Sequence, residues 1–396
     1  MKNALQWFNT FYDEVRKTKN WAVMEGTVEG SEWHREANVA VHTDMCIKHY
    51  IATTAQHRTE RQQALTLVTL LFHDFGKPEA EETLEAKDGS GRTYHRYAGH
   101  EPKSANEFLS FMMSHEDLTR AFFAQGFGWE DVRKIKWMIE HHLPFGLKNA
   151  TKRANLKRAM DTTLDVDVQC FYDQLWSDCN GRISDDHETK RTNVVTWIEE
   201  FKDQKPAPYK APKESARTMY VMVGPVGAGK STWIEEMRKA NRGARDIGFT
   251  IVSEDNYRHE YFVANVAKDE GNAWMLKGAK EQYAQAWQFC FDSKGAYDKY
   301  AREQLMKAVA SGQDLVLDRT NQTRKSRGPW VQAAKQAGYK IVTVEFFVSE
   351  ALSHARQKTR VDKDVPPFRT HQIYMAFEVP WDHVEADGHM IVPTFD

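Results

Sequence analysis

The spacing of apolar positions along the chain changes after residue 216. Before that point, apolar residues recur every three or four positions over five segments, which predicts amphipathic helices. A glycine-containing stretch over 87–100 interrupts this pattern and predicts a loop or a short hairpin. We therefore expect the first half to be almost wholly helical. The five predicted helical segments are 37–56, 61–74, 103–115, 130–141 and 167–180.

After residue 216, short apolar runs alternate with helical stretches, and this alternation predicts a parallel α/β sheet. A stretch with three prolines and several lysines separates the two patterns and is typical of a linker. We therefore predict an all-α domain over 1–203, a linker over 204–216 and an α/β domain over 217–396. The expected strands are 218–223, 249–252, 314–317 and 341–348.

The composition agrees with two folded domains and limits the classes of partner. Hydrophobic residues make up 41% of the 396 positions, which is enough for packed cores. The formal net charge is −2, so contact with a nucleic acid would depend on local basic patches. The four cysteines form no CxxC pair, which indicates free thiols rather than zinc held by sulfur. Because neither a signal-peptide pattern nor an apolar run of membrane-spanning length is found, we expect a cytoplasmic protein.

The segment Gly224–Thr232 reads GPVGAGKST and fits the phosphate-binding pattern G-x-x-x-x-G-K-S between a predicted strand and a predicted helix. Its glycines would let backbone N–H groups face the phosphates at a helix N-terminus. Lys230 would reach the β- and γ-phosphates and Ser231 would bind Mg²⁺, so the expected ligand is ATP, or another NTP, with Mg²⁺. The residues expected to contact the nucleotide are Gly224, Gly227, Gly229, Lys230, Ser231 and Thr232.

Candidate catalytic residues follow the predicted strands of the second half. Asp255 lies just past a strand end and Arg258 three residues later, where they could accept the proton of an attacking hydroxyl and hold an anionic group. A helix-capping aspartate with a surface arginine explains the same pattern. Arg356 and Arg360 share one helical face and could either close over ATP or form a solvated surface. Two further arginines after the third strand, Arg319 and Arg324, are candidates for substrate contacts.

The segment 215–380 resembles the 5′-hydroxyl polynucleotide kinase family. The resemblance rests on GPVGAGKSTW, on Asp-Asn-Tyr-Arg ending at Arg258, on a Thr-Asn pair after the third strand and on two arginines before VPPF. It implies that Asp255 is the general base and that Arg258 binds the phosphate of the acceptor. It also implies that Arg356 and Arg360 are arginines of a lid over the nucleotide.

Two positions depart from the pattern of that family. The family commonly has an aspartate directly before the Thr-Asn pair, whereas here Arg319 stands there and Asp318 lies one place earlier. The acidic Glu254 precedes the expected base, at a position where the phage enzyme of the family has a basic residue. Both departures concern the region expected to bind the acceptor.

Histidines and aspartates of the first half form the ordered series H…HD…H…HH…D. An adjacent His-Asp pair at a helix end can place two ligands on one metal, and imidazole with carboxylate suits a divalent transition metal. Additional histidines would allow two ions that share a bridging water, an arrangement suited to phosphoester hydrolysis. Lone helical histidines are more often hydrogen-bonded than metal-bound, and several of the sixteen must be bystanders. The series consists of His42, His73, Asp74, His100, His141, His142 and Asp178.

This series resembles the HD-domain phosphohydrolase superfamily over about 30–185. The segment EWHREANVAVHTDM is also similar to part of the hydrolase domain of some tRNA nucleotidyltransferases, which favours His42 over His34 as a ligand. The resemblance implies four core ligands, His42, His73, Asp74 and Asp178, and a second metal completed by His100 and His141. It leaves weaker, substrate-binding roles for His34, Lys77 and His142.

An HD phosphohydrolase ahead of a polynucleotide kinase resembles the HD-Pnk family of bifunctional end-healing enzymes. The resemblance implies that the first domain hydrolyses 2′,3′-cyclic, 2′- or 3′-phosphate ends of RNA or DNA. The second domain would transfer the γ-phosphate of an NTP to a 5′-hydroxyl end, and a ligase could act afterwards. Three alternatives stay open: an HD nucleotidase joined to a small-molecule kinase, a toxin-like sugar-nucleotide kinase, and a non-catalytic binding protein.

Overall fold

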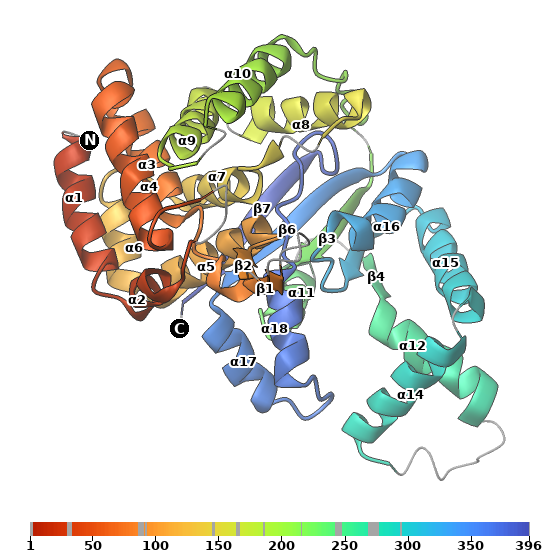
Figure 1. Cartoon of the computed structure of the whole chain (residues 1–396). Coiled ribbons are helices and arrows are strands. Elements are labelled where there is room, and N and C mark those ends of the chain that lie inside the picture. Colours follow the sequence, from red (N-terminus) through yellow and green to blue (C-terminus); the bar gives the residue numbers. More distant parts are fainter. Residues whose placement is uncertain are drawn as a thin grey trace. The chain divides into compact units, whose positions relative to one another are not determined.

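The computed structural model describes residues 3–29, 34–85, 91, 93–144, 147–163, 167–184, 187–214, 216–241, 248–267, 277–293 and 295–395. The chain divides into two compact units, Met1–Tyr209 and Lys210–Asp396. The first unit is helical apart from one hairpin, and the second contains a parallel sheet of five strands with flanking helices (Figure 1). The predicted fold class is therefore confirmed. Among the described residues, no helix is both long and apolar enough to cross a bilayer.

Helix α4 (Glu60–Phe72) is the central element of the first unit. A reciprocal capping box between Thr59 and Gln62 fixes its start. Every residue from Ala64 to Phe72 is buried, since α1, α3, α7 and α9 all pack against it. The His-Asp pair directly follows its last residue, so the candidate ligands lie at the end of a rigid, fully packed helix. The other helices of this unit are α1 (Ala4–Val15), α2 (Lys19–Gly26), α3 (Val39–Thr53), α5 (His100–Ser114), α6 (Glu116–Phe123), α7 (Trp129–Glu140), α8 (Ala150–Thr163), α9 (Val168–Asn180) and α10 (His187–Asp203).

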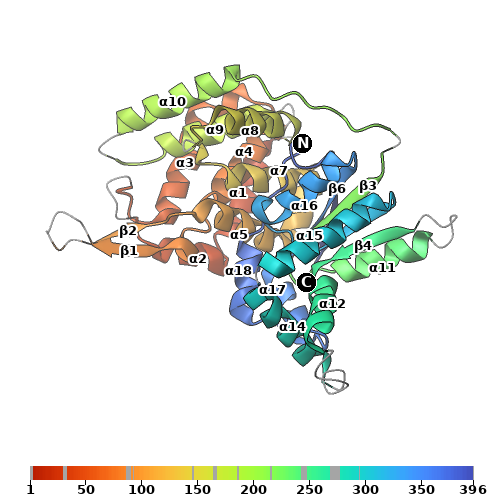
Figure 2. The same ribbon diagram turned by 90° about the vertical axis from the view of Figure 1, so that its right-hand side faces the viewer.

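The interruption in the helical pattern is an antiparallel hairpin of β1 (Glu82–Glu85) and β2 (Thr93–Arg96), seen at the edge of the helical unit in Figure 2. The prediction of a loop or short hairpin is thus confirmed, although 86–90 and 92 lie outside the described residues. Beyond α10, residues 204–213 form neither helix nor strand, and the first unit ends within this segment, at Tyr209. Arg158 of α8 donates hydrogen bonds to the carbonyls of Ala207 and Pro208 in this segment.

The sheet of the second unit has the strand order β4-β5-β3-β6-β7, and every pairing is parallel. The four predicted strands are present, and the fifth, β7, was not predicted. Its residues are only partly buried and include a proline, which fits an edge strand rather than an apolar run. The strands are β3 (Thr218–Val223), β4 (Phe249–Ser253), β5 (Asp314–Asp318), β6 (Lys340–Val348) and β7 (Gly388–Thr394).

Because the strands are parallel, the carboxyl ends of β3, β4 and β5 lie side by side, at the edge where open α/β sheets bind ligands. The phosphate-binding loop follows β3, α12 follows β4, and the Thr-Asn pair follows β5. The segments that carry the candidate site are therefore neighbours. The helices of this unit are α11 (Lys230–Asn241), α12 (Glu254–Phe262), α14 (Ala279–Ser293), α15 (Gly295–Ala310), α16 (Arg324–Gln336), α17 (Glu350–Lys358) and α18 (Pro367–Met375).

We expect Gly181→Ala to destabilise the first unit, because α3 and α9 approach each other closely there. A Cβ at position 181 would lie 2.5 Å from the backbone N and Cα of Cys46. Forcing the helices apart should cost about 2 kcal/mol or more of unfolding free energy, measured by calorimetry of the full chain. Gly26→Ala is the matched control, since a Cβ there meets nothing within 4 Å. Equal stability of the two variants would contradict this account of the packing.

Candidate functional site

Six ionisable side chains of the first unit meet at the C-terminal end of α4. His73 and Asp74 follow that helix, and the others come from four separate segments: His42 from α3, His100 from the start of α5, His142 from just after α7 and Asp178 from α9. All six are buried. Burial of this many imidazole and carboxylate groups is unfavourable unless they satisfy one another or bind an ion.

Backbone hydrogen bonds determine which ring nitrogen carries the proton in three of these histidines. The Nδ1 atoms of His73, His100 and His142 each lie 2.7 Å from a backbone carbonyl oxygen of the preceding turn or segment. A carbonyl only accepts, so Nδ1 is the donor and Nε2 of the neutral ring keeps its lone pair. This arrangement is typical of histidines that bind a metal through Nε2.

The Nε2 atoms of His100 and His142 face each other at 3.0 Å. Both also face one carboxylate oxygen of Asp74, at 3.1 Å and 3.7 Å. Burial, together with the neighbouring His100 and His73, lowers the pKa of His142 to about 3, so its lone pair is available at neutral pH. Two facing lone pairs beside a carboxylate repel unless a proton or a metal cation lies between them. Asp74, His100 and His142 therefore suit one cation.

A second set of ligand atoms lies on the other side of Asp74. His42 Nε2 is 3.2 Å from Asp178 Oδ1 and 3.5 Å from Asp74 Oδ2, and His73 Nε2 is 3.2 Å from Asp74 Oδ2. Within the described residues, His73 Nε2 is buried without a hydrogen-bond partner of ordinary geometry, whereas Asp74 Oδ2 also pairs with Lys77. The lone pair of His73 Nε2, close to His42 and Asp178, fits a second cation. Asp74 lies between the two sets and is the natural bridge.

Charges around the two aspartates keep both of them ionised. Although burial opposes it, His73 and Lys77 hold the pKa of Asp74 well below its ordinary value. In the same way, Arg182 and His42 overcome burial and keep the pKa of Asp178 low. Arg182 Nη2 lies 3.3 Å from Asp178 Oδ1. Both carboxylates are therefore available as anionic ligands.

Several residues that orient these ligands were not predicted from the sequence. Glu36 accepts a hydrogen bond from the backbone N–H of Ile183 at 2.6 Å, and its oxygens lie 3.6 Å from His42 Nδ1 and 3.4 Å from His34 Nδ1. The Sγ atom of Cys46 lies 3.5 Å from His42 Nε2 and belongs to the same group of candidate ligands. Cys46 lies one helical turn after His42, a spacing that could have identified it.

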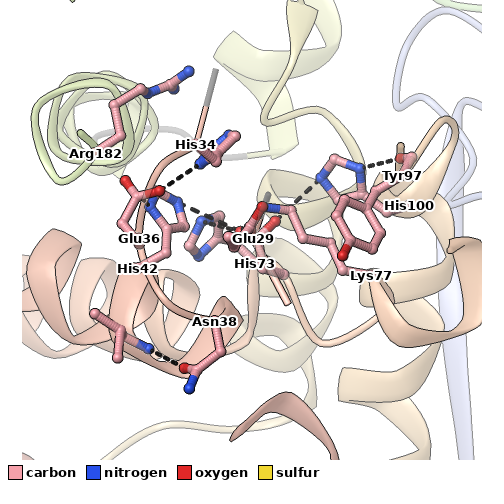
Figure 3. A network of polar contacts seen from close by, with 12 residues as sticks. Glu29, His34, Glu36, Asn38, His42, His73, Lys77, Tyr97, His100 and Arg182 are labelled. Atoms are coloured by element: carbon pink, nitrogen blue, oxygen red, sulfur yellow. Dashed lines mark hydrogen bonds and ion pairs between the residues drawn. The ribbon is translucent and has the colours of Figure 1, made fainter. Parts of the chain in front are cut away.

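The structure gives Lys77 and His141 partners that the sequence did not suggest. Lys77, a candidate for phosphate contact, is buried, and its ammonium group pairs with Asp74 at 2.8 Å and with Glu29. Figure 3 shows Lys77 between Glu29 and Tyr97, with His100 beyond it. His141, a candidate ligand, instead stacks on Trp137, and its Nδ1 lies 2.8 Å from the Trp137 carbonyl oxygen. The structure groups His142 with Asp74 and His100 in the place proposed for His141.

A cavity of about 730 Å³ opens onto these ligands. His34, one of the weaker substrate candidates, lies in its wall. The basic side chains of Arg96 and Arg182 also line it, so an anionic group that entered would meet positive charge next to the candidate ligands. Its other wall residues include Asp74, Lys77, His100, His142 and Asp178.

The phosphate-binding loop of the second unit has the backbone that its glycines predict. Gly227 and Gly229 have φ of 74° and 96°, in the left-handed region that favours glycine. A Cβ at Gly227 would also lie 2.9 Å from the carbonyl oxygen of Ser353. Lys230 donates a hydrogen bond to the Gly224 carbonyl at 2.9 Å, at the floor of a cavity of about 1320 Å³. Ser231 and Thr232 line the same cavity.

Asp318, at the end of β5, also lines this cavity and was not assigned a role from the sequence. An aspartate at the end of a neighbouring strand helps to hold Mg²⁺ in P-loop enzymes, together with the loop serine. Burial raises the pKa of Asp318, while the nearby Lys230 lowers it. For the cationic Lys230 burial acts in the opposite direction: it lowers the pKa to about 7, and the positive charges of Lys363 and Arg360 also lower it.

Asp255 and Arg258 begin helix α12 and face the same cavity. Arg258 Nη1 lies 3.0 Å from Asp255 Oδ1, and Lys363 Nζ contacts the other carboxylate oxygen. Although burial opposes it, Lys363 and Arg258 hold the pKa of Asp255 below its ordinary value. Asp255 is therefore ionised at neutral pH and can accept a proton. Lys363 is a further site residue that the sequence did not single out.

The two positions that depart from the polynucleotide kinase pattern are partners in the structure. Glu254 contacts Arg319 through one carboxylate oxygen and Arg258 Nη2 through the other, at 2.6 Å for Arg258. Arg319 also lies over the ring of Trp330. Glu254 thus orients two arginines at once, and each unusual residue compensates the charge of the other.

The remaining arginine candidates divide into two groups. Arg356 and Arg360 line the cavity, and Arg356 donates a hydrogen bond to the carbonyl of Gly227 in the phosphate-binding loop at 3.2 Å. Arg360 pairs with Asp362 at its rim. Arg324, in contrast, lies over the ring of Trp381, outside the described lining of the cavity. The structure does not bring Arg324 into the site.

Residues 219–380 match a family model described as an AAA domain. The match spans the phosphate-binding loop, α12, Arg356 and Arg360, and it is consistent with a P-loop kinase. It indicates kinase-type nucleotide binding by the second unit. No curated protein matches the chain.

The two adjacent histidines give a matched test of the metal site. We expect His142→Ala to lower the bound divalent metal to about half or less, because one of two ligand sets loses a donor. His141→Ala should retain the metal, since that ring packs on Trp137. Elemental analysis of the purified variants measures both. Equal loss in the two variants, or none in either, would contradict the assignment.

Lys230 should take up a proton when a nucleotide binds. Its pKa of about 7 in the free protein leaves it mostly neutral at pH 8, and phosphate oxygens would raise that pKa. Nucleotide affinity should therefore fall as pH rises above 7, by at most about tenfold per pH unit, until the pKa of the bound form is reached.

Calorimetry at pH 8 in HEPES and in Tris tests this uptake, because the two buffers release protons with different enthalpies. We expect about one proton per nucleotide. Lys239→Ala, which removes an exposed lysine of α11, is the control and should behave like the wild type. A binding enthalpy that is the same in both buffers would show that Lys230 is already charged.

Proposed function

We propose that this protein is a bifunctional end-healing enzyme for broken RNA or DNA. In this proposal, the second unit transfers the γ-phosphate of an NTP to a 5′-hydroxyl end. The first unit hydrolyses a 2′,3′-cyclic, 2′- or 3′-phosphate end, and a ligase could then join the product. The observation that carries the proposal is the presence, on one chain, of a buried set of candidate metal ligands and a separate phosphate-binding loop with an ionised aspartate in its cavity.

The kinase step needs a base, an acceptor site and charge neutralisation. The 5′-hydroxyl oxygen would bond to the γ-phosphorus while Asp255 accepts the hydroxyl proton. The bond between the γ-phosphorus and the oxygen that bridges it to the β-phosphate would break. Lys230 and Arg356, which reach the phosphate-binding loop, would neutralise the transferred phosphoryl group. Arg258, held by Glu254 and Asp255, would bind a phosphate of the acceptor.

The hydrolytic step would occur in the cavity of the first unit. Divalent ions held by the two ligand sets would polarise a phosphate and promote ionisation of water. The chain itself contributes the anionic ligands Asp74 and Asp178 and the positive charge of Arg96 and Arg182 in the cavity wall. In the reaction, a water oxygen bonds to phosphorus and the bond from phosphorus to the 2′- or 3′-oxygen breaks.

An oligonucleotide with a 5′-hydroxyl and a 2′,3′-cyclic phosphate tests both activities at once, with ATP and divalent metal. We expect the wild type to convert both ends. Lys230→Ala and Asp255→Ala should lose at least about 100-fold of the kinase activity and keep the phosphoesterase activity. Asp74→Ala should show the reverse pattern. Loss of both activities in any single variant would contradict two independent sites.

The same assay separates end healing from nucleotide metabolism. A free nucleoside and a free 2′,3′-cyclic nucleotide serve as competing substrates for the two sites. Transfer to nucleosides without transfer to oligonucleotides would favour a small-molecule kinase joined to an HD nucleotidase. Exchange of ATP for GTP in the same reactions would determine which NTP is used.

A further inference from the structure

Helix α14 presents three aromatic side chains to the nucleotide cavity. Tyr283, Trp287 and Phe291 are spaced by four residues, so they lie on one helical face, and all three line the cavity. Trp287 is 40% exposed and Phe291 is 56% exposed. Their rings stack on each other, with centroids 5.3 Å apart and planes at 8°. The row formed by these three residues is called the aromatic row below.

The aromatic row begins beside the catalytic candidates. The ammonium group of Lys363, which pairs with Asp255, also lies over the ring of Tyr283, 5.4 Å from its centroid. Four residues of helix advance about 6 Å, so the row extends roughly 12 Å from Tyr283 to Phe291. It therefore leads away from the proposed base along α14, which packs on α12.

Positive charge accompanies these rings in the same cavity. Arg258, Arg360 and Lys363 line it, together with Arg369 of α18. Aromatic faces next to basic side chains are what proteins use to bind single-stranded nucleic acid, where bases stack on rings and phosphates meet cations. A free nucleoside would need one ring at most, whereas the row offers three in succession.

We propose that the aromatic row is a base-stacking platform for the single-stranded 5′ end of the acceptor. The inference rests on the proposed kinase function and names the class of acceptor it takes. The first base would stack near Tyr283, with its 5′-hydroxyl at Asp255, and following bases would lie along Trp287 and Phe291. Stacking does not distinguish between bases, so the platform selects for single-strandedness and length rather than sequence.

The test compares 5′-hydroxyl acceptors of increasing length, from a nucleoside 3′-phosphate to a ten-nucleotide single strand. For the wild type we expect kcat/KM to rise with the first few nucleotides. Replacing both exposed rings, in Trp287→Ala/Phe291→Ala, should raise KM for the ten-nucleotide strand at least about tenfold. The KM for ATP and activity on the nucleoside 3′-phosphate should change little.

Two further variants separate stacking from a loss of structure. Trp287→Phe keeps an aromatic face at this position, so its KM for the ten-nucleotide strand should stay close to the wild-type value. Met306→Ala removes another exposed apolar side chain, on α15 and outside the described cavity lining, and should leave every constant unchanged.

The possible outcomes are distinct. The stacking platform would be overturned if wild-type kcat/KM did not depend on acceptor length. It would also be overturned if the double variant lost the same activity on short and long acceptors. Either result would leave the kinase assignment intact. Failure of the wild type to phosphorylate any 5′-hydroxyl acceptor would overturn the proposed function itself. Quenching of tryptophan fluorescence by a single strand that occurs in the wild type and is lost in Trp287→Phe would support the platform directly.

Discussion

The first unit is organised around one buried carboxylate, that of Asp74 at the end of α4. A buried charge is tolerated only when partners compensate it. Here His73 and Lys77 compensate it from nearby positions in the chain, and His42 and His100 do so from distant ones. Packing of α3, α5 and the segment after α7 around the end of α4 is therefore what brings the ligand atoms within a few ångströms of one another.

The second unit depends on a different constraint, the parallel alignment of its central strands. Since β3, β4 and β5 end at one edge, the strand alignment brings the phosphate-binding loop, Asp255 and Asp318 together there. Ion pairs then refine the site. Lys363 keeps Asp255 anionic, and the Glu254–Arg319 pair explains why both residues depart together from the polynucleotide kinase pattern.

Local sequence patterns were sufficient to predict those elements whose structure depends on interactions between residues close together in the chain. Apolar periodicity identified the main helices of the first unit and four of the five strands described, and the pattern GPVGAGKST predicted a phosphate-binding loop between a strand and a helix. The strand β7 was missed because an edge strand with a proline lacks the apolar run of a buried strand. The His-Asp pair at a helix end was recognisable because both residues are adjacent in the chain.

By itself, the sequence determined the two fold classes, the phosphate-binding loop and the residue types of the candidate ligands. Only the tertiary structure distinguished the surroundings of His141 and His142, because adjacent residues at a helix end point in different directions and His141 packs on Trp137. It also paired Glu254 with Arg319 and aligned the aromatic row with Asp255. Those relations depend on distances between separate elements, which spacing along one chain does not specify.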